Sequence, residues 1–320
     1  MKLHFFFLTC IILFSCDKKD KSHVFGKNDA KWIQIEKDLP EKDSLFYQDD
    51  PSPIFRKKLF VNKKIKDAKL YVTSAGYNAV FINDKRVGKN ILDPAWTDYS
   101  KRMYYTEYDV IDLLMQEQNV INVMLGNGFY NPLPLKMWGW LNLRNETNVG
   151  KPKFILKLII TYIDGNKDEI VSDSSWKYSF GPIVRNSVYL GSHYDARNEI
   201  KGWQSSNFDD SSWNNAQISQ SPGGILEKAF FPGVEITKEI EPVKIYEIDK
   251  KKWIVDMGEN FTGTYKIKLS GNSGDKVSFR LGERVYDDGS LNPMTAVTGQ
   301  IKRKGVCLLY TSPSPRDGTS

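Results

Sequence analysis

Short stretches of alternating apolar and polar residues, separated by turn-forming residues, run along the chain from about Phe55. In residues 68–74 this alternation places Leu70 and Val72 on one face, within a segment rich in strand-forming residues. Further strands are expected at residues 77–82, 85–87, 103–110, 119–125, 153–163 and 169–171, with turns at 83–84 and 164–165. An apolar period of 3.6 residues never persists for three helical turns. The pattern predicts an all-β protein, most consistent with a jelly-roll sandwich.

A second series of strands is expected after Pro242, at residues 243–248, 253–257, 262–269 and 276–281. The segment that joins the two series is rich in Pro and Gly and carries charges, which indicates a domain boundary near residues 235–243. We therefore expect a tether and leading segment at residues 16–52, a β-sandwich at 53–235 and the start of a second β-sandwich at 243–304.

The N-terminus is typical of an export signal. Met1-Lys2 precedes an apolar run over residues 3–14, which is shorter than the ~20 residues that span a bilayer. The sequence Leu13-Phe14-Ser15-Cys16 is similar to a bacterial lipobox. It predicts a signal peptide over residues 1–15, lipidation of Cys16, and an exported, membrane-anchored lipoprotein in the periplasm or at the cell surface. A plain secretory signal with an incidental cysteine is the alternative.

Residues 305–320 do not continue the pattern of strands and turns. We expect this tail, which contains Cys307, to be non-native and translated from sequencing-adapter sequence, with the gene continuing elsewhere. A genuine Ser/Pro-rich linker is the alternative. Since Cys10 leaves with the signal peptide, the 3 cysteines cannot form a disulfide framework.

Composition narrows the possible partners. The 45 basic and 39 acidic residues are scattered rather than clustered, so we expect no nucleic-acid partner. Neither zinc-ligand spacing nor a Ser/His/Asp or Cys/His arrangement is present, and His193 is expected to be packed or at a rim. Asp209 and Asp210 are adjacent on an extended segment, so their side chains should point to opposite sides rather than form an acid–base pair.

Aromatic residues make up 13% of the chain, with 8 Trp and 16 Tyr, which suits both sandwich cores and sugar stacking. Trp138 and Trp140, with Phe129 and Tyr130 shortly before them, are the best candidates for sugar contact, because a loop between strands can present two indole rings. Asn127 and Asn131 could donate hydrogen bonds to sugar hydroxyls. The alternative is that these rings pack against a neighbouring domain.

Several motifs carry a family resemblance through their order and spacing. They are LDPAWTDY at residues 92–99, LGNGFYN at 125–131, FDDSSW at 208–213, VDMGENFTG at 255–263 and LNPMTA at 291–296. Together they resemble the N-terminal region of the bacterial α-L-rhamnosidases, over roughly residues 53–302. The resemblance implies a galactose-binding-like sandwich and a second, concanavalin-like sandwich ahead of an (α/α)₆ barrel.

The resemblance also implies a function. It suggests an inverting glycoside hydrolase acting on rhamnose-containing glycans, with the catalytic acid and base on the barrel. The chain has no helical-hairpin array for that barrel, so we expect no catalytic residue in it and no activity of its own. Sandwiches of this kind often carry a structural calcium, but no stretch concentrates carboxylates enough to name ligands. The alternatives are a non-catalytic carbohydrate-binding surface lipoprotein and a structural or adhesion sandwich.

Overall fold

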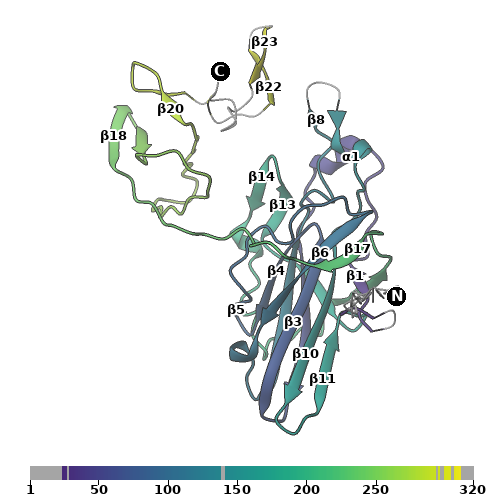
Figure 1. Ribbon diagram of the computed structural model, residues 1–320. Coiled ribbons are helices and arrows are strands. Elements are labelled where there is room, and N and C mark those ends of the chain that lie inside the picture. The colour runs from purple at the N-terminus through teal and green to yellow at the C-terminus, as the bar shows by residue number, and fades with distance from the viewer. Residues whose placement is uncertain are drawn as a thin grey trace, which may run out of the picture.

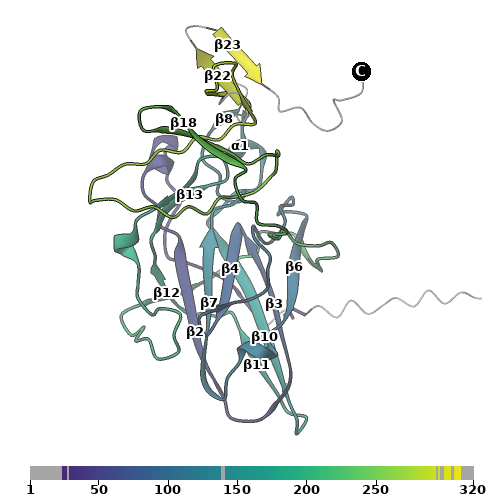
Figure 2. The same ribbon diagram turned by 90° about the vertical axis from the view of Figure 1, so that its left-hand side faces the viewer.

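The protein is described by a computed structural model that covers residues 24–26, 29–137, 141–292, 295, 299–303 and 306–310. Two β-sheets pack face to face in the N-terminal part (Figures 1 and 2). The first sheet has the order β16-β1-β10-β3-β6-β17, with β11 also paired to β10, and the second has the order β15-β12-β2-β7-β4-β5. Neighbouring strands are antiparallel except β17 and β6, which are parallel. The prediction of an all-β sandwich is confirmed.

The strands of the first sheet are β1 (Trp32–Gln34), β3 (Ile65–Ala75), β6 (Arg102–Asp109), β10 (Lys153–Tyr162), β11 (Lys167–Val171), β16 (Gln217–Ser219) and β17 (Ile225–Lys228). Those of the second are β2 (Pro53–Val61), β4 (Tyr77–Ile82), β5 (Lys85–Arg86), β7 (Glu117–Gly126), β12 (Lys177–Phe180) and β15 (Asn214–Asn215). Separate hairpins are β8 (Lys136–Met137) with β9 (Leu141–Asn142), and β13 (Ile183–Ser187) with β14 (Gly191–Tyr194). Short helices are η1 (Asp43–Tyr47), η2 (Ile111–Leu113), α1 (Leu143–Glu146) and η3 (Ala196–Asn198). None of the helices in the described part of the chain is long and apolar enough to cross a membrane.

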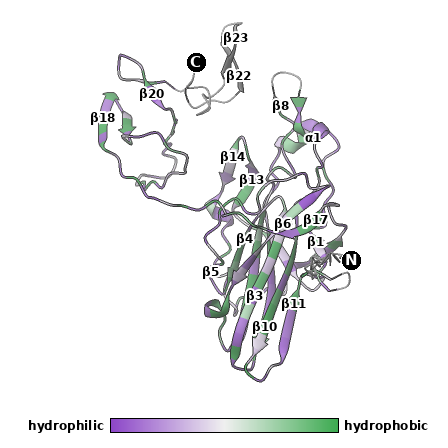
Figure 3. Ribbon diagram, in the orientation of Figure 1, coloured by the Kyte–Doolittle hydropathy of each residue, from purple (hydrophilic) through white to green (hydrophobic). Residues whose placement is uncertain are grey.

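Alternating side chains form the core between the two sheets. Leu70 and Val72 of β3 are buried on one face, as the alternation predicts, and they pack in one cluster with Phe154 of β10. From the second sheet Phe55 meets Phe154 edge-on, with ring centroids 5.1 Å apart. Hydrophobic positions are concentrated on central strands such as β3, whereas the edge strand β11 is mainly hydrophilic (Figure 3). Burial of the inner faces therefore holds the sandwich together.

Local turn chemistry sets the tight connections. Asn83 and Asp84 adopt positive φ values of 52° and 61° between β4 and β5. Two consecutive residues with positive φ are the requirement of a two-residue hairpin loop, and Asn and Asp tolerate that conformation well. The hairpin predicted at this point is confirmed, and so is the turn at Gly165, whose φ is 86°.

The C-terminal part differs from expectation. The strands predicted at 243–248 and 253–257 are confirmed as the hairpin of β18 (Lys244–Asp249) and β19 (Lys252–Asp256), which lies apart from the sandwich in Figure 1. The strands predicted at 262–269 and 276–281 are wrong, because both segments lack strand structure. Their apolar side chains are exposed, with Tyr265 and Phe279 among them. An alternating segment forms a strand only when a neighbouring strand pairs with it and its apolar face is covered.

Short hairpins end the described chain. They pair β20 (Arg284–Val285) with β21 (Leu291–Asn292), and β22 (Gly299–Arg303) with β23 (Val306–Tyr310). The predicted non-native tail begins inside the second of these hairpins. The predicted signal peptide and Cys16 lie outside the described residues.

Candidate functional site

The loop that follows β7 contains Asn127, one of the predicted sugar-binding residues. Its backbone N–H donates to Asn186 Oδ1 over 2.7 Å, and its Nδ2 donates to the carbonyl oxygen of Asn186 over 2.9 Å. Asn127 Oδ1 accepts a hydrogen bond from Asn131 Nδ2, also at 2.9 Å. Asn127 is buried, so these contacts fasten the loop to β13. Sugar binding by this amide stays a prediction.

Asn131 is held in the same network by a cation. Arg144 of α1 donates from Nη1 to Asn131 Oδ1 over 2.8 Å and to the carbonyl oxygen of Pro132 over 2.7 Å. The guanidinium also lies 3.8 Å from the centroid of the Phe46 ring. Burial lowers the pKa of Arg144, opposed by the charge of Asp43. Both asparagines of the predicted sugar site are therefore engaged in joining β7, β13 and α1.

Tyr130 lies below this loop rather than on its surface. Its side chain is 4% exposed, and its ring meets Tyr99 edge-on with centroids 5.0 Å apart. Lys153 Nζ lies 6.0 Å from the ring centroid, and burial raises the pKa of Tyr130. A Cβ added at Gly150 would lie 2.5 Å from the Tyr130 hydroxyl, which shows how closely the backbone approaches. Tyr130 offers no open face for stacking in this conformation.

The other two candidates, Trp138 and Trp140, lie outside the described residues. Their contact with sugar stays a prediction.

Exposed aromatic rings gather beside the same loop. Trp96 stacks on Phe129, with centroids 4.2 Å apart and an interplanar angle of 19°. Tyr189 meets the edge of Phe129 at 6.2 Å. Trp96 is 49% exposed and Tyr189 is also exposed, so this group presents ring surface to solvent. We call Trp96, Phe129 and Tyr189 the aromatic platform.

Of the aromatic platform, only Phe129 was expected from the sequence to lie in a sugar-binding group. Trp96 and Tyr189 were not, although Trp96 lies within one of the family motifs. Residue type and spacing mark both Trp96 and Tyr130 as loop aromatics, but only the packing of the loops reveals which ring is exposed. An indole ring that stacks on another ring yet keeps half its surface free suits contact with a flat C–H surface.

Arg185 and His193 lie on the two strands of the hairpin whose loop carries Tyr189. Arg185 Nη2 lies 2.9 Å from His193 Nε2, and Arg185 also donates to the carbonyl oxygen of Tyr47. His193 is exposed on β14. Within the described ranges there is no group of three His, Cys, Asp or Glu side chains placed to hold a metal ion, so the ligands of a structural calcium stay unidentified.

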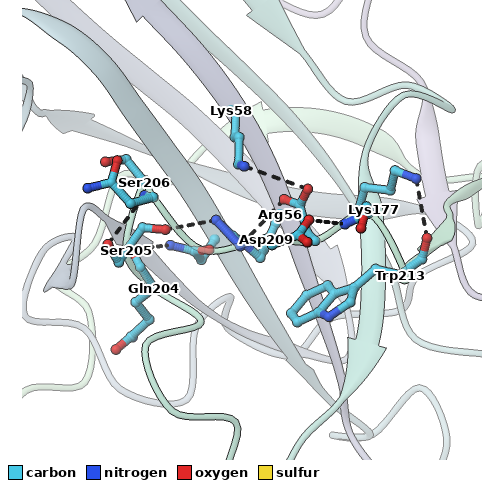
Figure 4. Close-up of polar contacts among 12 residues, drawn as sticks. Arg56, Lys58, Lys177, Gln204, Ser205, Ser206, Asp209 and Trp213 are labelled. Carbon is cyan, nitrogen blue, oxygen red and sulfur yellow. Dashed lines mark hydrogen bonds and ion pairs between the residues drawn. The ribbon is translucent and has the colours of Figure 1, made fainter.

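Asp209 and Asp210 hold the loop at residues 204–213 through separate contacts. Asp209 Oδ1 accepts a hydrogen bond from the backbone N–H of Ser211 at 2.9 Å. Asp210 instead lies 3.4 Å from Arg56 and 3.8 Å from Lys58 of β2. Figure 4 shows Arg56 and Lys58 reaching toward this loop. The two carboxylates have separate partners, which agrees with a structural role rather than an acid–base pair.

Together these features define a two-sheet β-sandwich protein with an exposed aromatic surface where β7 ends. The chain belongs to the α-L-rhamnosidase family. The profile of the α-L-rhamnosidase N-terminal domain matches residues 63–238, and that of the bacterial α-L-rhamnosidase concanavalin-like domain matches residues 246–312. The second match extends into the tail expected to be non-native.

Relatives support the same assignment. An α-L-rhamnosidase from Formosa agariphila is 32% identical over 277 residues, which cover 82% of this chain and 29% of the relative. The solved α-L-rhamnosidase from Dictyoglumus thermophilum superposes with a TM-score of 0.71 at 39% identity, covering 84% of this chain and 30% of that one. The Streptomyces avermitilis α-L-rhamnosidase, solved in complex with L-rhamnose, gives a TM-score of 0.69 at 29% identity, covering 77% and 24% of the two chains. The chain thus spans less than a third of the length of these relatives.

Proposed function

We propose that this chain forms the accessory N-terminal part of an exported α-L-rhamnosidase, which removes terminal α-L-rhamnose from glycans or glycosides. The match of the N-terminal domain profile to residues 63–238, which include most strands of the sandwich, carries this proposal. In this proposal the catalytic acid and base of an inverting mechanism lie on a helical barrel that these residues do not include.

Hydrolysis with inversion requires two carboxyl groups about 6.5–9.5 Å apart, with space for a water between them. The carboxylates of the anchoring loop do not meet this need, because Asp209 caps a turn and Asp210 faces two cations. We therefore propose that the sandwich supports binding or assembly rather than bond cleavage.

Incubation of the purified chain with an aryl α-L-rhamnoside tests this proposal. We expect no release of the phenol above the rate in buffer, while a complete α-L-rhamnosidase releases it under the same conditions. Release that grows in proportion to the concentration of the chain would show that a catalytic pair lies within these residues.

Export and anchoring are the second part of the proposal. Acyl chains on Cys16 would bury ~0.8 kcal/mol per CH₂, so a multiply acylated N-terminus stays at a membrane. In a bacterial host, Cys16→Ser should move the protein from the membrane fraction to the soluble fraction and abolish labelling by a radioactive fatty acid. Cys10→Ser is the matched control, since Cys10 lies within the predicted signal and should change neither result. Persistence of Cys16→Ser protein in the membrane fraction would refute the anchor.

A second candidate function is a non-catalytic carbohydrate-binding surface lipoprotein. The observation that favours it is the aromatic platform, since Trp96 presents ring surface to solvent. This candidate requires glycan binding by the chain itself. The Trp96→Ala variant in the binding experiment below distinguishes the platform from another site.

A further inference from the structure

A separate cavity of about 110 Å³ lies at one edge of the sandwich. Three stretches of the chain line it: the loop before β6, β6 itself, and the segment that begins at the end of β17. Its lining includes Asn90, Asp93, Tyr104, Thr106, Lys228 and Phe231. A water molecule occupies ≈ 30 Å³ in the liquid, so several hydroxyl-sized groups fit this space.

Asp93 is the unusual residue of this cavity because it is an acidic residue that is only 8% exposed. It accepts hydrogen bonds from Asn90 Nδ2 at 3.2 Å, Thr106 Oγ1 at 3.1 Å and the Tyr108 hydroxyl at 3.5 Å. These donors are all neutral, and the distances exceed the ≈ 2.7–2.9 Å of charge-assisted bonds. Burial raises the pKa of Asp93, against these hydrogen bonds and the charge of Arg86.

A carboxylate has about four acceptor positions, and three neutral donors occupy most of those of Asp93, which leaves room for one stronger donor from a ligand. Because Asp93, Asn90 and Thr106 all line the cavity, a ligand there can reach acceptor and donor groups together. Such a set of groups suits a molecule whose hydroxyls both donate and accept.

Aromatic rings lie on the side of the cavity opposite these polar groups. Phe231 meets Tyr104 edge-on with centroids 5.0 Å apart, and Phe230 meets the same ring at 5.7 Å. Phe230 is 82% exposed, so the sandwich core makes little use of it. Aromatic faces beside hydrogen-bonding groups match the two surfaces of a pyranose, which has C–H faces and a hydroxyl edge.

Apart from Asp93, the charged groups that line the cavity cancel each other. Lys228 Nζ lies 2.6 Å from Glu107 Oε2, so these two charges neutralise each other. A divalent cation would need six to eight oxygen ligands, several of them carboxylates, and an aromatic wall would add none. A neutral polyol fits this lining better than a cation.

We propose that this cavity binds the hydroxyl edge of one pyranose unit of a neutral glycan. Asp93 accepts a hydrogen bond from one sugar hydroxyl, and Phe231 contacts the C–H face at the mouth. The choice of α-L-rhamnose as the sugar rests on the proposed function. The expectation that the cavity binds a pyranose rests on its lining residues alone. The site is distinct from the aromatic platform, which lies around Phe129.

Calorimetric titration of the purified chain with methyl α-L-rhamnopyranoside tests the site, with the glucose and galactose glycosides in parallel. Asp93→Asn keeps the shape of the side chain and removes its charge. Loss of one charge-assisted hydrogen bond should weaken binding about tenfold. Because the substitution removes a buried charge, the midpoint temperature of thermal unfolding should stay unchanged or rise. Asp67→Asn, at an exposed carboxylate of β3, is the matched control and should bind as the parent does.

Phe231→Ala gives a second, independent measure and should also weaken binding, whereas Trp96→Ala should not. Unchanged affinity of a folded Asp93→Asn protein would overturn the site. Loss of binding only in Trp96→Ala would overturn it too and assign binding to the aromatic platform. Binding of glucose or galactose glycosides without the rhamnoside, still sensitive to Asp93→Asn, would support the cavity and contradict the choice of rhamnose. Absence of binding by all three glycosides would overturn the site while leaving family membership intact.

Discussion

Replacing Gly76 with alanine is expected to lower the free energy of unfolding of the sandwich by about 2–4 kcal/mol. Gly76 connects β3 to β4 with a φ of 96°, a conformation that side chains disfavour. A Cβ there would lie 2.3 Å from the carbonyl oxygen of Gly126 and 3.2 Å from that of Asn127. Both atoms belong to the backbone, so no side chain can rotate away to make room.

The clash would act on the register of the second sheet. Tyr77, the next residue, pairs with Gly126 at the start of the β4–β7 ladder. Separating Gly76 from Gly126 must shift this pair, and with it the loop that holds Asn127 against β13. The cost therefore includes lost pairing as well as backbone strain.

Gly165→Ala is the matched control for Gly76→Ala. Gly165 has a similar φ of 86°, but a Cβ built there meets no atom within 4 Å. The free energy of unfolding of Gly165→Ala should fall by only about 1 kcal/mol, because alanine disfavours the left-handed conformation. Urea unfolding followed by tryptophan fluorescence measures both variants. Equal losses at the two glycines would show that the approach of the Gly126 carbonyl is not limiting.

The parts of the fold that could be predicted are those encoded within a few residues. Asn83-Asp84 fixes a two-residue turn by its own conformational preference, and Leu70 and Val72 mark the inner face of β3 by alternation. The parallel pairing of β17 with β6 joins residues more than one hundred positions apart. No local pattern specifies such a partner, so this pairing could not be predicted from the sequence.

The two strands wrongly predicted in the C-terminal part show the limit of alternation. Residues 262–269 alternate as a strand should, but Ile267 and Leu269 remain exposed. Alternation describes a segment that can form a strand with one buried face. Whether it does so depends on pairing and coverage from elsewhere.

The candidate site shows the same limit at the level of single residues. Tyr130 and Trp96 are both aromatic residues of loops, yet the first is buried and the second is half exposed. The sequence marks Asp93 only as a member of the LDPAWTDY motif at residues 92–99, and it does not reveal that this residue is buried. Its burial depends on Thr106 and Tyr108, which reach it from β6, 13 and 15 residues further along the chain.

Replacing Arg56 with alanine is the other substitution with a large expected effect. It should lower the free energy of unfolding by about 2–4 kcal/mol. Arg56 is fully buried on β2 and donates from Nη2 to the carbonyl oxygen of Ser205 over 2.9 Å (Figure 4). Its guanidinium lies 4.9 Å from the ring centroid of Phe208 and 5.7 Å from that of Trp213. Burial lowers the pKa of Arg56, opposed by the charge of Asp210.

The Arg56→Ala substitution removes the cation that the loop at residues 204–213 covers. Asp210 then loses its partner at 3.4 Å and keeps only Lys58, at 3.8 Å. The two aromatic rings lose the group on which they lie, and the space left by the side chain cannot close without moving the loop. The loop should therefore become a preferred site of limited proteolysis in Arg56→Ala.

Lys58→Ala is the matched control because Lys58 contacts the same carboxylate from a partly exposed position. An exposed pair contributes only about 0.2–1 kcal/mol, so this variant should unfold close to the parent and resist proteolysis equally. Arg56→Met separates charge from packing, since it keeps an apolar stem below Phe208 and Trp213. If the charge of Arg56 matters most, Arg56→Met should lower the free energy of unfolding nearly as much as Arg56→Ala. Adding Asp210→Asn to either variant should then recover part of that stability, because it removes the unpaired carboxylate. If both Arg56 variants unfold no more easily than Lys58→Ala, the buried guanidinium does not anchor the loop. Other contacts then hold it, such as the hydrogen bond from Lys177 Nζ to the carbonyl oxygen of Trp213.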